Sequence, residues 1–230
     1  MDALLLSLKL ALCVSVILLA GGLPLAYWLA YSKWRGKFLL EAIVALPLVL
    51  PPTVLGFYVL VAMGPRGPLG KLWQVAFGHG LAFTFVGLVL ASVLYSLPFA
   101  VQPLIASFES VDRKLLDASA VLGAGRLRTF WRVILPLSSP GVVTAVVLSF
   151  AHTMGEFGVV LMVGGDLAGG TRTVSIDIYD HVQSLEYADA NRMALVLLAI
   201  SFAVLSVVYA VNRQVGRQIG RPLWTPWTAK

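Results

Sequence analysis

The sequence predicts an all-α protein built from membrane-spanning helices, and its composition and its apolar runs carry that prediction. Hydrophobic residues make up 59% of the 230 residues and charged residues only 12%, which leaves too little polar surface for a soluble domain of this length. Five apolar runs are long enough to cross a bilayer, which takes about 20 residues of helix. They lack period-two alternation, so we expect helices rather than a barrel.

The five spans are expected at about residues 4–30, 39–63, 80–107, 138–163 and 192–211, within one membrane domain that covers residues 1–230. The first span resembles a retained anchor more than a cleaved signal peptide, because its basic cluster follows the apolar run. A sixth element could lie in the loop 164–191, where Val174, Ile176 and Ile178 suggest a short buried or re-entrant segment. An ordinary solvated loop is the alternative there.

The basic residues predict the orientation of the spans. Twelve of the 17 Lys and Arg residues lie on one side of the membrane: Lys33, Arg35, Lys37, Arg113, Lys114, Arg126, Arg128, Arg132, Arg213, Arg217, Arg221 and Lys230. By the positive-inside rule that side is cytoplasmic, with the amino terminus outside and the carboxy terminus inside. Topology therefore explains the net charge of +6, and no nucleic-acid partner is expected.

The loop 109–136 is the most polar stretch between adjacent spans. Ser110 or Asp112 could cap a helix that ends near Gly123. One face of this helix would carry two small residues between two leucines, which lets another surface approach the backbone closely. The members of that face are Leu115, Ala118, Ser119 and Leu122.

A second short helix is expected in the same loop, from Arg126 to about Ile134, with Pro136 ending it. Phe130 and Trp131 leave another interpretation open, in which the whole loop is amphipathic and rests on the membrane surface.

The loop resembles the coupling segment of the permeases of ATP-binding-cassette importers. That segment is written Glu-Ala-Ala, three residues, Gly, nine residues, Ile, any residue, Leu-Pro. Asp117-Ala118-Ser119, Gly123 and Leu135-Pro136 keep its spacing, with Asp for Glu, Ser for the second Ala and Val133 for Ile as the departures. The resemblance implies that the loop docks on a separate ATPase subunit. The residues assigned to this coupling are Asp117, Ala118, Ser119, Leu122, Gly123, Ala124, Gly125, Arg126, Leu135 and Pro136.

The chain itself is not expected to be an enzyme. Its nearest approach to a phosphate-binding loop is the segment 64–71, whose glycine spacing is one residue too long and which is followed by Leu72 where a hydroxyl is needed. Its three histidines have no metal-ligand spacing. No cofactor or metal is expected in this chain, and ATP and Mg²⁺ are expected on the partner ATPase.

The second span holds Pro47, Pro51 and Pro52, which must bend it. A bent helix in the middle of a membrane is tolerated where neighbours or a pathway satisfy the freed carbonyls. We assign these prolines, with Thr53 and Gly56, to the translocation pathway; a purely structural kink is the alternative.

The fourth span holds Glu156, the only acidic residue deep in any span, with His152 one turn before it. Such residues face protein or water, so His152, Gly155, Glu156 and Gly158 are assigned to a gate or a subunit interface. A buried pair of Glu156 with His152 or with backbone donors is the alternative. Substrate contact is not favoured, because ionised Glu156 would repel a dianion and deep Lys or Arg is lacking.

Four segments together resemble the molybdate and sulfate permease family of ATP-binding-cassette importers, and most closely its molybdate members. They are the proline-rich second span, the Gly-Pro-Arg-Gly-Pro-Leu-Gly turn, the Gly-Glu-Phe-Gly element at 155–158 and the Gly-x-Thr-Arg-Thr loop. The likeness runs over residues 4–211. It implies the type I importer permease fold, with five to six spans, in a prokaryotic cell (inner) membrane.

The resemblance also implies partners: a second copy of the chain, two ATPase subunits, an extracytoplasmic oxyanion-binding protein and membrane lipid. The expected function is import of molybdate or tungstate by alternating access, with selectivity in the binding protein. A sulfate or thiosulfate importer is one alternative. Another is an ATP-independent secondary transporter in which His152 and Glu156 relay protons.

Overall fold

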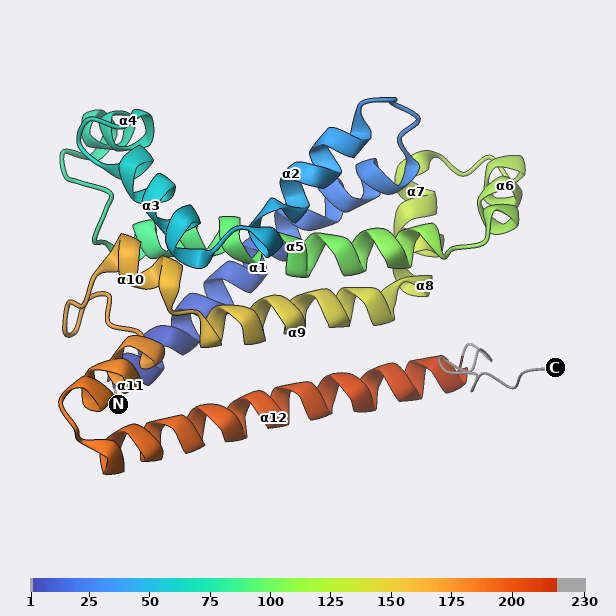
Figure 1. The fold of residues 1–230 in the computed structure, drawn as a ribbon. Coiled ribbons are helices and arrows are strands. Elements are labelled where there is room, and N and C mark those ends of the chain that lie inside the picture. The colour runs from blue at the N-terminus through green and yellow to red at the C-terminus, as the bar shows by residue number, and fades with distance from the viewer. Residues whose placement is uncertain (1, 219–230) are drawn as a thin grey trace.

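The computed structural model describes residues 2–218, and those residues form helices and no strand (Figure 1). The elements are α1 (Asp2–Tyr31), α2 (Lys37–Val49), α3 (Pro52–Met63), α4 (Pro68–Phe77), α5 (Phe85–Glu109), α6 (Arg113–Val121), α7 (Arg126–Thr129), the π-helical turn η1 (Phe130–Ile134), α8 (Leu135–Leu137), α9 (Ser139–Gly155), α10 (Gly158–Gly164), α11 (Val174–Gln183) and α12 (Tyr187–Gln218). Arg221 and Lys230 of the predicted basic set lie outside the described residues. The predicted all-α membrane fold is confirmed.

Three helices of the described chain are long and apolar enough to cross a membrane: α1, α5 and the part of α12 from Tyr187 to Ala210. Two bent pairs bring the number to five if each pair is one span: α2 with α3, bent by 113°, and Arg126–Leu137 with α9, bent by 73°. The predicted spans 4–30, 80–107 and 192–211 each lie largely within one helix. The span 39–63, which we expected to be bent, and the span 138–163 are each divided between two helices.

The predicted span 39–63 breaks at Pro51 and Pro52. A proline pushes the residue before it out of the helical region, and here this acts twice in succession: Leu50 has ψ of 135° and Pro51 has ψ of 137°. Pro47 lies inside α2 without ending it. The double proline therefore produces a sharp turn between two helices, where we expected a kink.

The predicted span 138–163 breaks at Glu156 and Phe157. Glu156 is extended, with ψ of 135°, and α10 begins again at Gly158. Glycine weakens a helix interior by about 0.5–1 kcal/mol relative to alanine, so the glycines on both sides make this an easy place to interrupt the helix.

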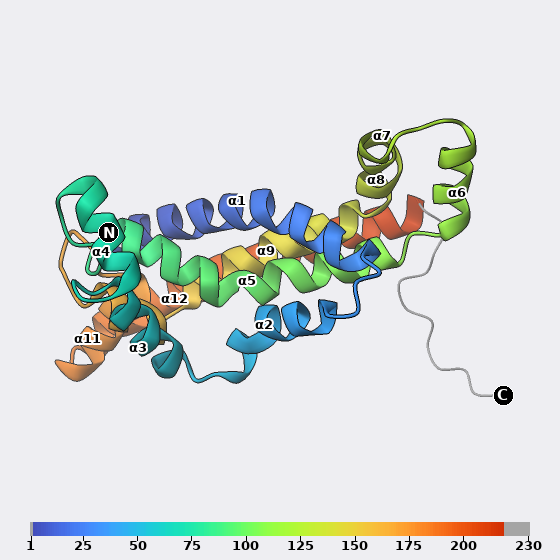
Figure 2. The same cartoon turned by 90° about the horizontal axis from the view of Figure 1, so that it is seen from above.

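The helices α1, α5 and α9 run side by side through the centre of the bundle (Figures 1 and 2). Leu10 of α1 and Leu88 of α5 are fully buried there, in one cluster with Val160 of α10. Between α5 and α9 the Ser96 hydroxyl lies 2.9 Å from the Thr153 hydroxyl and 3.1 Å from His152 Nδ1. Such pairs satisfy polar groups inside an apolar bundle.

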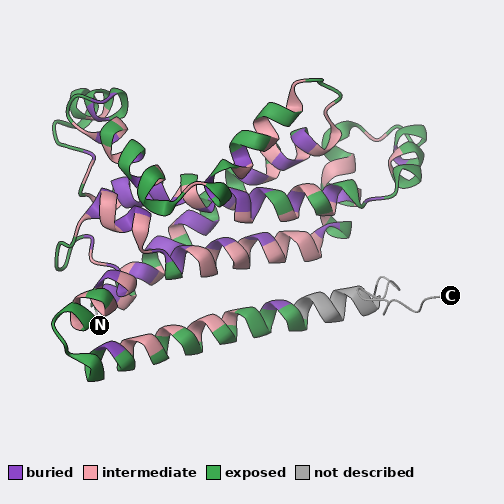
Figure 3. Ribbon diagram, viewed as in Figure 1, coloured by how far each residue is buried: buried purple, intermediate pink, exposed green. Residues whose placement is uncertain are grey.

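The bundle has two distinct ends. The start of α1, α4, α10 and α11 gather at one end, and α6 and α7 stand at the other (Figures 1 and 2). The helix α12 lies along the outside of the bundle, with only 6% of its spanning window buried, and Figure 3 shows its described part as largely exposed or half-buried. Its apolar surface is therefore available to lipid or to another subunit.

Two short helices lie where the sequence indicated turns or loops. The helix α4 begins at Pro68, a residue that favours the first helical position, although the sequence suggested only a turn there. The loop 164–191 contains α11, whose Val174 and Ile176 are buried. The buried segment that was one of two alternatives for this loop is thus present, as a helix.

Candidate coupling surface and translocation pathway

The helix α6 begins at a side-chain cap. The Asp112 carboxylate accepts a hydrogen bond from the amide of Lys114 at 2.9 Å, which satisfies one of the free amides of the first turn. Of the two predicted caps, Asp112 is therefore the right one; the Ser110 hydroxyl donates instead to the carbonyl of Ser107.

The helix α6 ends at Gly123, as predicted. Gly123 has φ of +72°, a left-handed conformation that suits glycine. Its amide donates to the Ala120 carbonyl at 2.9 Å, and the amide of Ala124 donates to the Ser119 carbonyl at 3.0 Å. These two bonds are the pair of a Schellman motif, so the glycine of the coupling segment closes its helix.

The second helix of the loop runs past its predicted end. The segment is helical from Arg126 through Leu137, and the bend into α9 follows at Ser138. Pro136 is part of α8, directly after the π-helical turn η1. The wider π turn gives a proline ring more room beside the preceding turn than a regular helix does, which accounts for the error.

Apolar side chains on α6 and the helix after it stand out into solvent. Their exposed fractions are 46% for Leu115, 88% for Val121, 86% for Leu122, 73% for Leu127 and 58% for Trp131. We call these five residues the coupling surface. Exposed apolar residues gathered on an otherwise charged loop are typical of a protein–protein interface.

One member of the predicted docking face is wrongly placed. Ser119 is the only buried residue of α6, and its hydroxyl lies 2.8 Å from the Thr129 hydroxyl. It therefore faces the second helix and not the solvent. Of the other predicted coupling residues, Asp117, Ala118, Leu122, Gly123, Gly125, Arg126 and Pro136 are exposed, and Ala124 and Leu135 are half-buried.

The two helix breaks, at Pro51–Pro52 and at Glu156–Phe157, lie next to each other in the folded structure. A Cβ atom on Gly158 would come within 2.7 Å of the Cβ of Pro52, and one on Gly56 within 2.9 Å of the Cβ of Met162. The helices α3 and α10 thus cross at two glycines. Without side chains at those positions, the backbones approach closely.

A cavity of about 620 Å³ opens beside this crossing. Six of the predicted pathway residues line it: Pro52, Thr53, His152, Gly155, Glu156 and Gly158, together with Tyr95, Ala151, Phe157, Leu161 and Met162. Gly56 lies at the crossing itself. Pro47 is buried within α2 and Pro51 is at the α2–α3 turn, so the structure does not bring these two into the cavity.

Glu156 is 5% exposed, and its carboxyl group is buried beside the Ser92 hydroxyl, although neither carboxyl oxygen makes a hydrogen bond of good geometry within the described residues. The pair with His152 is not formed, because His152 Nδ1 faces the Ser96 hydroxyl at 3.1 Å and its ring stacks on Phe99 with centroids 3.8 Å apart. Burial of a polar group without a partner is costly. Glu156 is thus the least satisfied polar side chain beside the cavity.

The sequence interpretation missed the side chains that α5 brings to this site. Tyr95 lines the cavity, Ser96 bonds to His152 and Phe99 stacks on it. Ser92 is buried on the same helix, next to the Glu156 carboxyl group. Two serines four residues apart in an apolar span lie on one helix face, and that spacing was the available signal.

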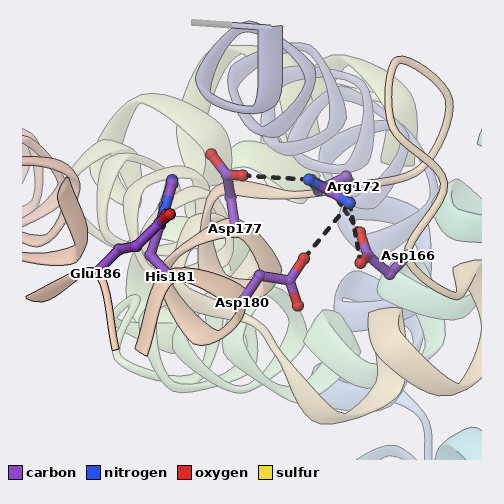
Figure 4. A network of polar contacts seen from close by, with 6 residues as sticks. All are labelled: Asp166, Arg172, Asp177, Asp180, His181 and Glu186. Carbon is purple, nitrogen blue, oxygen red and sulfur yellow. Dashed lines mark hydrogen bonds and ion pairs between the residues drawn. The ribbon is translucent and has the colours of Figure 1, made fainter. Parts of the chain in front are cut away.

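Figure 4 shows a polar network of the α10–α11 loop and α11, and Figure 1 places α11 at the end of the bundle opposite α6. The Arg172 guanidinium makes two hydrogen bonds to Asp166, one of them 3.0 Å long, and lies 3.7 Å from Asp177 and 3.5 Å from Asp180. The loop is also bonded to the end of α10, since the Thr171 hydroxyl donates to the Gly164 carbonyl at 2.6 Å. Thr171 and Arg172 of the predicted loop thus tie α10 to α11.

Charge interactions shift the pKa values in this network. The hydrogen bond to Asp166 and the charges of the three carboxylates raise the pKa of Arg172. Burial acts to raise the pKa of Asp166, but its interactions with Asp180 and Arg172 outweigh this and lower it. Burial and the neighbouring Asp166 raise the pKa of Asp180. Asp166 is therefore the principal partner of the guanidinium.

Comparison with known proteins gives a consistent result. Residues 22–220 match the family model described as "Binding-protein-dependent transport system inner membrane component". The chain is 52% identical over 208 residues to the molybdenum transport system permease protein ModB of Azotobacter vinelandii, covering 90% of this chain and 92% of that protein. It is 37% identical to ModB of Escherichia coli K12, covering 90% of each.

Solved structures share the fold at low sequence identity. A bacterial alginate ABC transporter in complex with a periplasmic protein matches with a TM-score of 0.76 at 16% identity, over 93% of this chain and 78% of that one. The MetNI methionine ABC transporter matches with a TM-score of 0.68 at 17% identity, over 93% and 94%. The chain therefore belongs to the family of binding-protein-dependent transport system inner membrane components, the permeases of ATP-binding-cassette importers.

Proposed function

We propose that this chain is the permease subunit of an ATP-driven importer of molybdate, with tungstate as a close chemical analogue. Two copies form the translocation pathway, two ATPase subunits dock on the loop 109–136, and an extracytoplasmic binding protein delivers the oxyanion. ATP and Mg²⁺ bind on the ATPase subunits, and this chain holds no cofactor. Hydrolysis on those subunits drives alternating access between the two sides of the membrane.

The observation that carries the proposal is the coupling surface. Val121 and Leu122 are almost fully exposed at the end of a capped helix, where their burial against a partner would be favourable by about 1.5–3 kcal/mol for each side chain. A loop resting on the membrane would also bury apolar groups. However, the helix α6 itself stands beyond the end of the bundle (Figure 1), and its apolar side chains are exposed there, as docking on a soluble subunit requires.

The orientation follows from the same end of the molecule. Arg113, Lys114, Arg126, Arg128 and Arg132 all belong to the α6–η1 segment, and the positive-inside rule places such a segment in the cytoplasm. The start of α1 lies at the opposite end (Figure 2). The amino terminus is therefore outside, and α12 runs from outside to inside.

The proposed second copy covers surfaces that one copy leaves open. The α2 and α3 surface carries exposed Val49, Phe57 and Tyr58, next to the cavity where the two helix breaks meet. A homodimer that joins these faces encloses the cavity between its two subunits. Lipid covers the remaining apolar surface, including much of α12.

The pathway favours passage of an oxyanion over its capture. Among the described residues that line the cavity, the ionisable groups are Glu156, His152 and Tyr95, without Lys or Arg. A dianion would find no fixed cation there. Selectivity then belongs to the binding protein, and the molybdate assignment rests on the relatives named molybdenum permeases.

The test is uptake into proteoliposomes. The chain is reconstituted with its ATPase subunits, the loaded binding protein is added outside and ATP is enclosed inside. The proposal expects ATP-dependent accumulation of molybdate. Accumulation of sulfate or thiosulfate alone would reassign the substrate, and accumulation that needs a proton gradient but no ATP would replace the importer with a secondary transporter.

A further inference from the structure

The helix α6 has an inward face as well as the outward coupling surface. Leu116 packs against the apolar cluster around Phe108, and Ser119, three residues later on the same face, is buried. The neighbouring element that α6 chiefly contacts is α7. Whatever displaces α6 must therefore act on the rest of the chain through these few contacts.

The polar contact in that set is the hydrogen bond between the hydroxyls of Ser119 and Thr129, 2.8 Å long. Ser119 is also the residue whose carbonyl accepts the Ala124 amide at the end of α6. The bond thus joins the closed end of α6 to the last residue of α7. The importer segment that this loop resembles has alanine in place of Ser119, which could not make the bond.

The residue after Thr129, Phe130, packs against the apolar core of the helix bundle. The Phe130 ring packs edge-on against Tyr27, with centroids 5.2 Å apart, and against Phe108 at 6.0 Å. The Tyr31 hydroxyl in turn donates to the Phe108 carbonyl at 2.7 Å. From Phe130 the chain continues through η1 and α8 into α9. This helix carries His152 and Gly155, which line the cavity assigned to the translocation pathway.

A cavity of about 450 Å³ lies between α1 and the α6–α7 pair, lined by residues that include Trp28, Leu116, Ala120 and Arg126. This space means that α6 does not rest on α1 along its length. A helix with so little packing behind it would shift without moving its neighbours unless a specific contact held it to them.

We propose that the Ser119–Thr129 hydrogen bond makes α6 and α7 one rigid unit and so passes the motion of the docked ATPase to Phe130 and α9. Both residues are positioning residues, since they act through the helices that they join. The inference rests on the proposed function, because it needs an ATPase on the coupling surface.

The experiment compares wild type with S119A, T129V and the double variant in the full complex. T129S keeps the hydroxyl and is the conservative rescue; S110A removes a hydroxyl of the same loop that bonds only to a backbone carbonyl. The quantity measured is ATP hydrolysed per oxyanion imported. A hydrogen bond contributes about 0.5–1.5 kcal/mol, so each single variant should raise this ratio about two- to tenfold, and the double variant no further. T129S and S110A should match wild type.

An unchanged ratio in T129V, or effects that multiply in the double variant, would overturn the inference. Failure of the proposed function is recognised separately, by a wild-type complex that imports no oxyanion. In that case a second measurement decides: the ATP-dependent change in hydrogen exchange of the α9 amides in the complex with the ATPase. The change should be lost in T129V and kept in T129S, and its persistence in T129V would contradict the proposed linkage.

Discussion

Gly158 and Pro52 touch at the point where two interrupted helices cross: a Cβ atom added to Gly158 would lie 2.7 Å from the Cβ of Pro52. One break comes from a double proline and the other from a glycine-flanked glutamate. The cavity that we assign to the pathway lies beside this contact, between elements about 100 residues apart in sequence.

Gly158→Ala should destabilise the protein. The proline ring cannot move away from the added methyl group, and overpacking of this kind costs about 1–3 kcal/mol. Thermal unfolding in nanodiscs measures the effect. Gly21→Ala is the control, because its Cβ would meet no atom within 4 Å. Equal melting temperatures for the two variants would show that α3 and α10 are not in close contact.

Leu122→Asp should prevent assembly with the ATPase and leave the chain itself intact. Its side chain is 86% exposed, so the charge has little to disturb in the isolated subunit, yet it would be buried in the complex. Co-purification with the ATPase measures assembly, and unfolding of the isolated subunit is the control. Normal assembly would remove Leu122 from the docking site.

Gly123→Ala should impair coupling through backbone strain. At φ of +72° a non-glycine residue costs about 1–2 kcal/mol, which would loosen the end of α6. Gly123→Asn should be milder, since asparagine tolerates this conformation. The ratio of ATP hydrolysed to oxyanion imported should be higher in the Gly123→Ala variant than in the Gly123→Asn variant. The reverse order would mean that backbone strain is not the cause.

Glu156→Gln should leave the affinity of the whole complex for its oxyanion almost unchanged. The substitution preserves shape and removes any negative charge of the carboxyl group, while the proposed function assigns selectivity to the binding protein. The oxyanion concentration for half-maximal import measures this. A large change in that concentration would mean that the pathway itself binds the substrate.

Arg172→Ala should lower the melting temperature more at pH 7 than at low pH. Because Arg172 lowers the pKa of Asp166, their interaction is fully present above the ordinary Asp pKa of ~3.9 and is lost as pH falls through the lowered pKa of Asp166. Asp166→Asn should also destabilise the network at pH 7, and Asp180→Asn less so. A melting-temperature difference between wild type and Arg172→Ala that does not depend on pH would contradict this account.

How far the sequence predicts this protein depends on the range of the interactions. Asp112 and Gly123 were predictable because caps are local. The break at Glu156 was not predicted, although the glycines on both sides of it are a local signal; its contact with Pro52 joins segments far apart in sequence. The sequence prediction placed Ser119 on the outward face of α6. Its spacing from neighbouring residues is compatible with either face, and its hydrogen bond to Thr129 shows that it lies on the inward one.

The measurement that tests the central claim most directly is the ATPase activity of the reconstituted complex with its binding protein loaded in turn with molybdate, tungstate or sulfate. The account predicts stimulation by the molybdate- and tungstate-loaded binding protein and little by sulfate. Stimulation by sulfate alone would contradict the substrate, and a well-assembled complex that none of the three stimulates would contradict the importer itself.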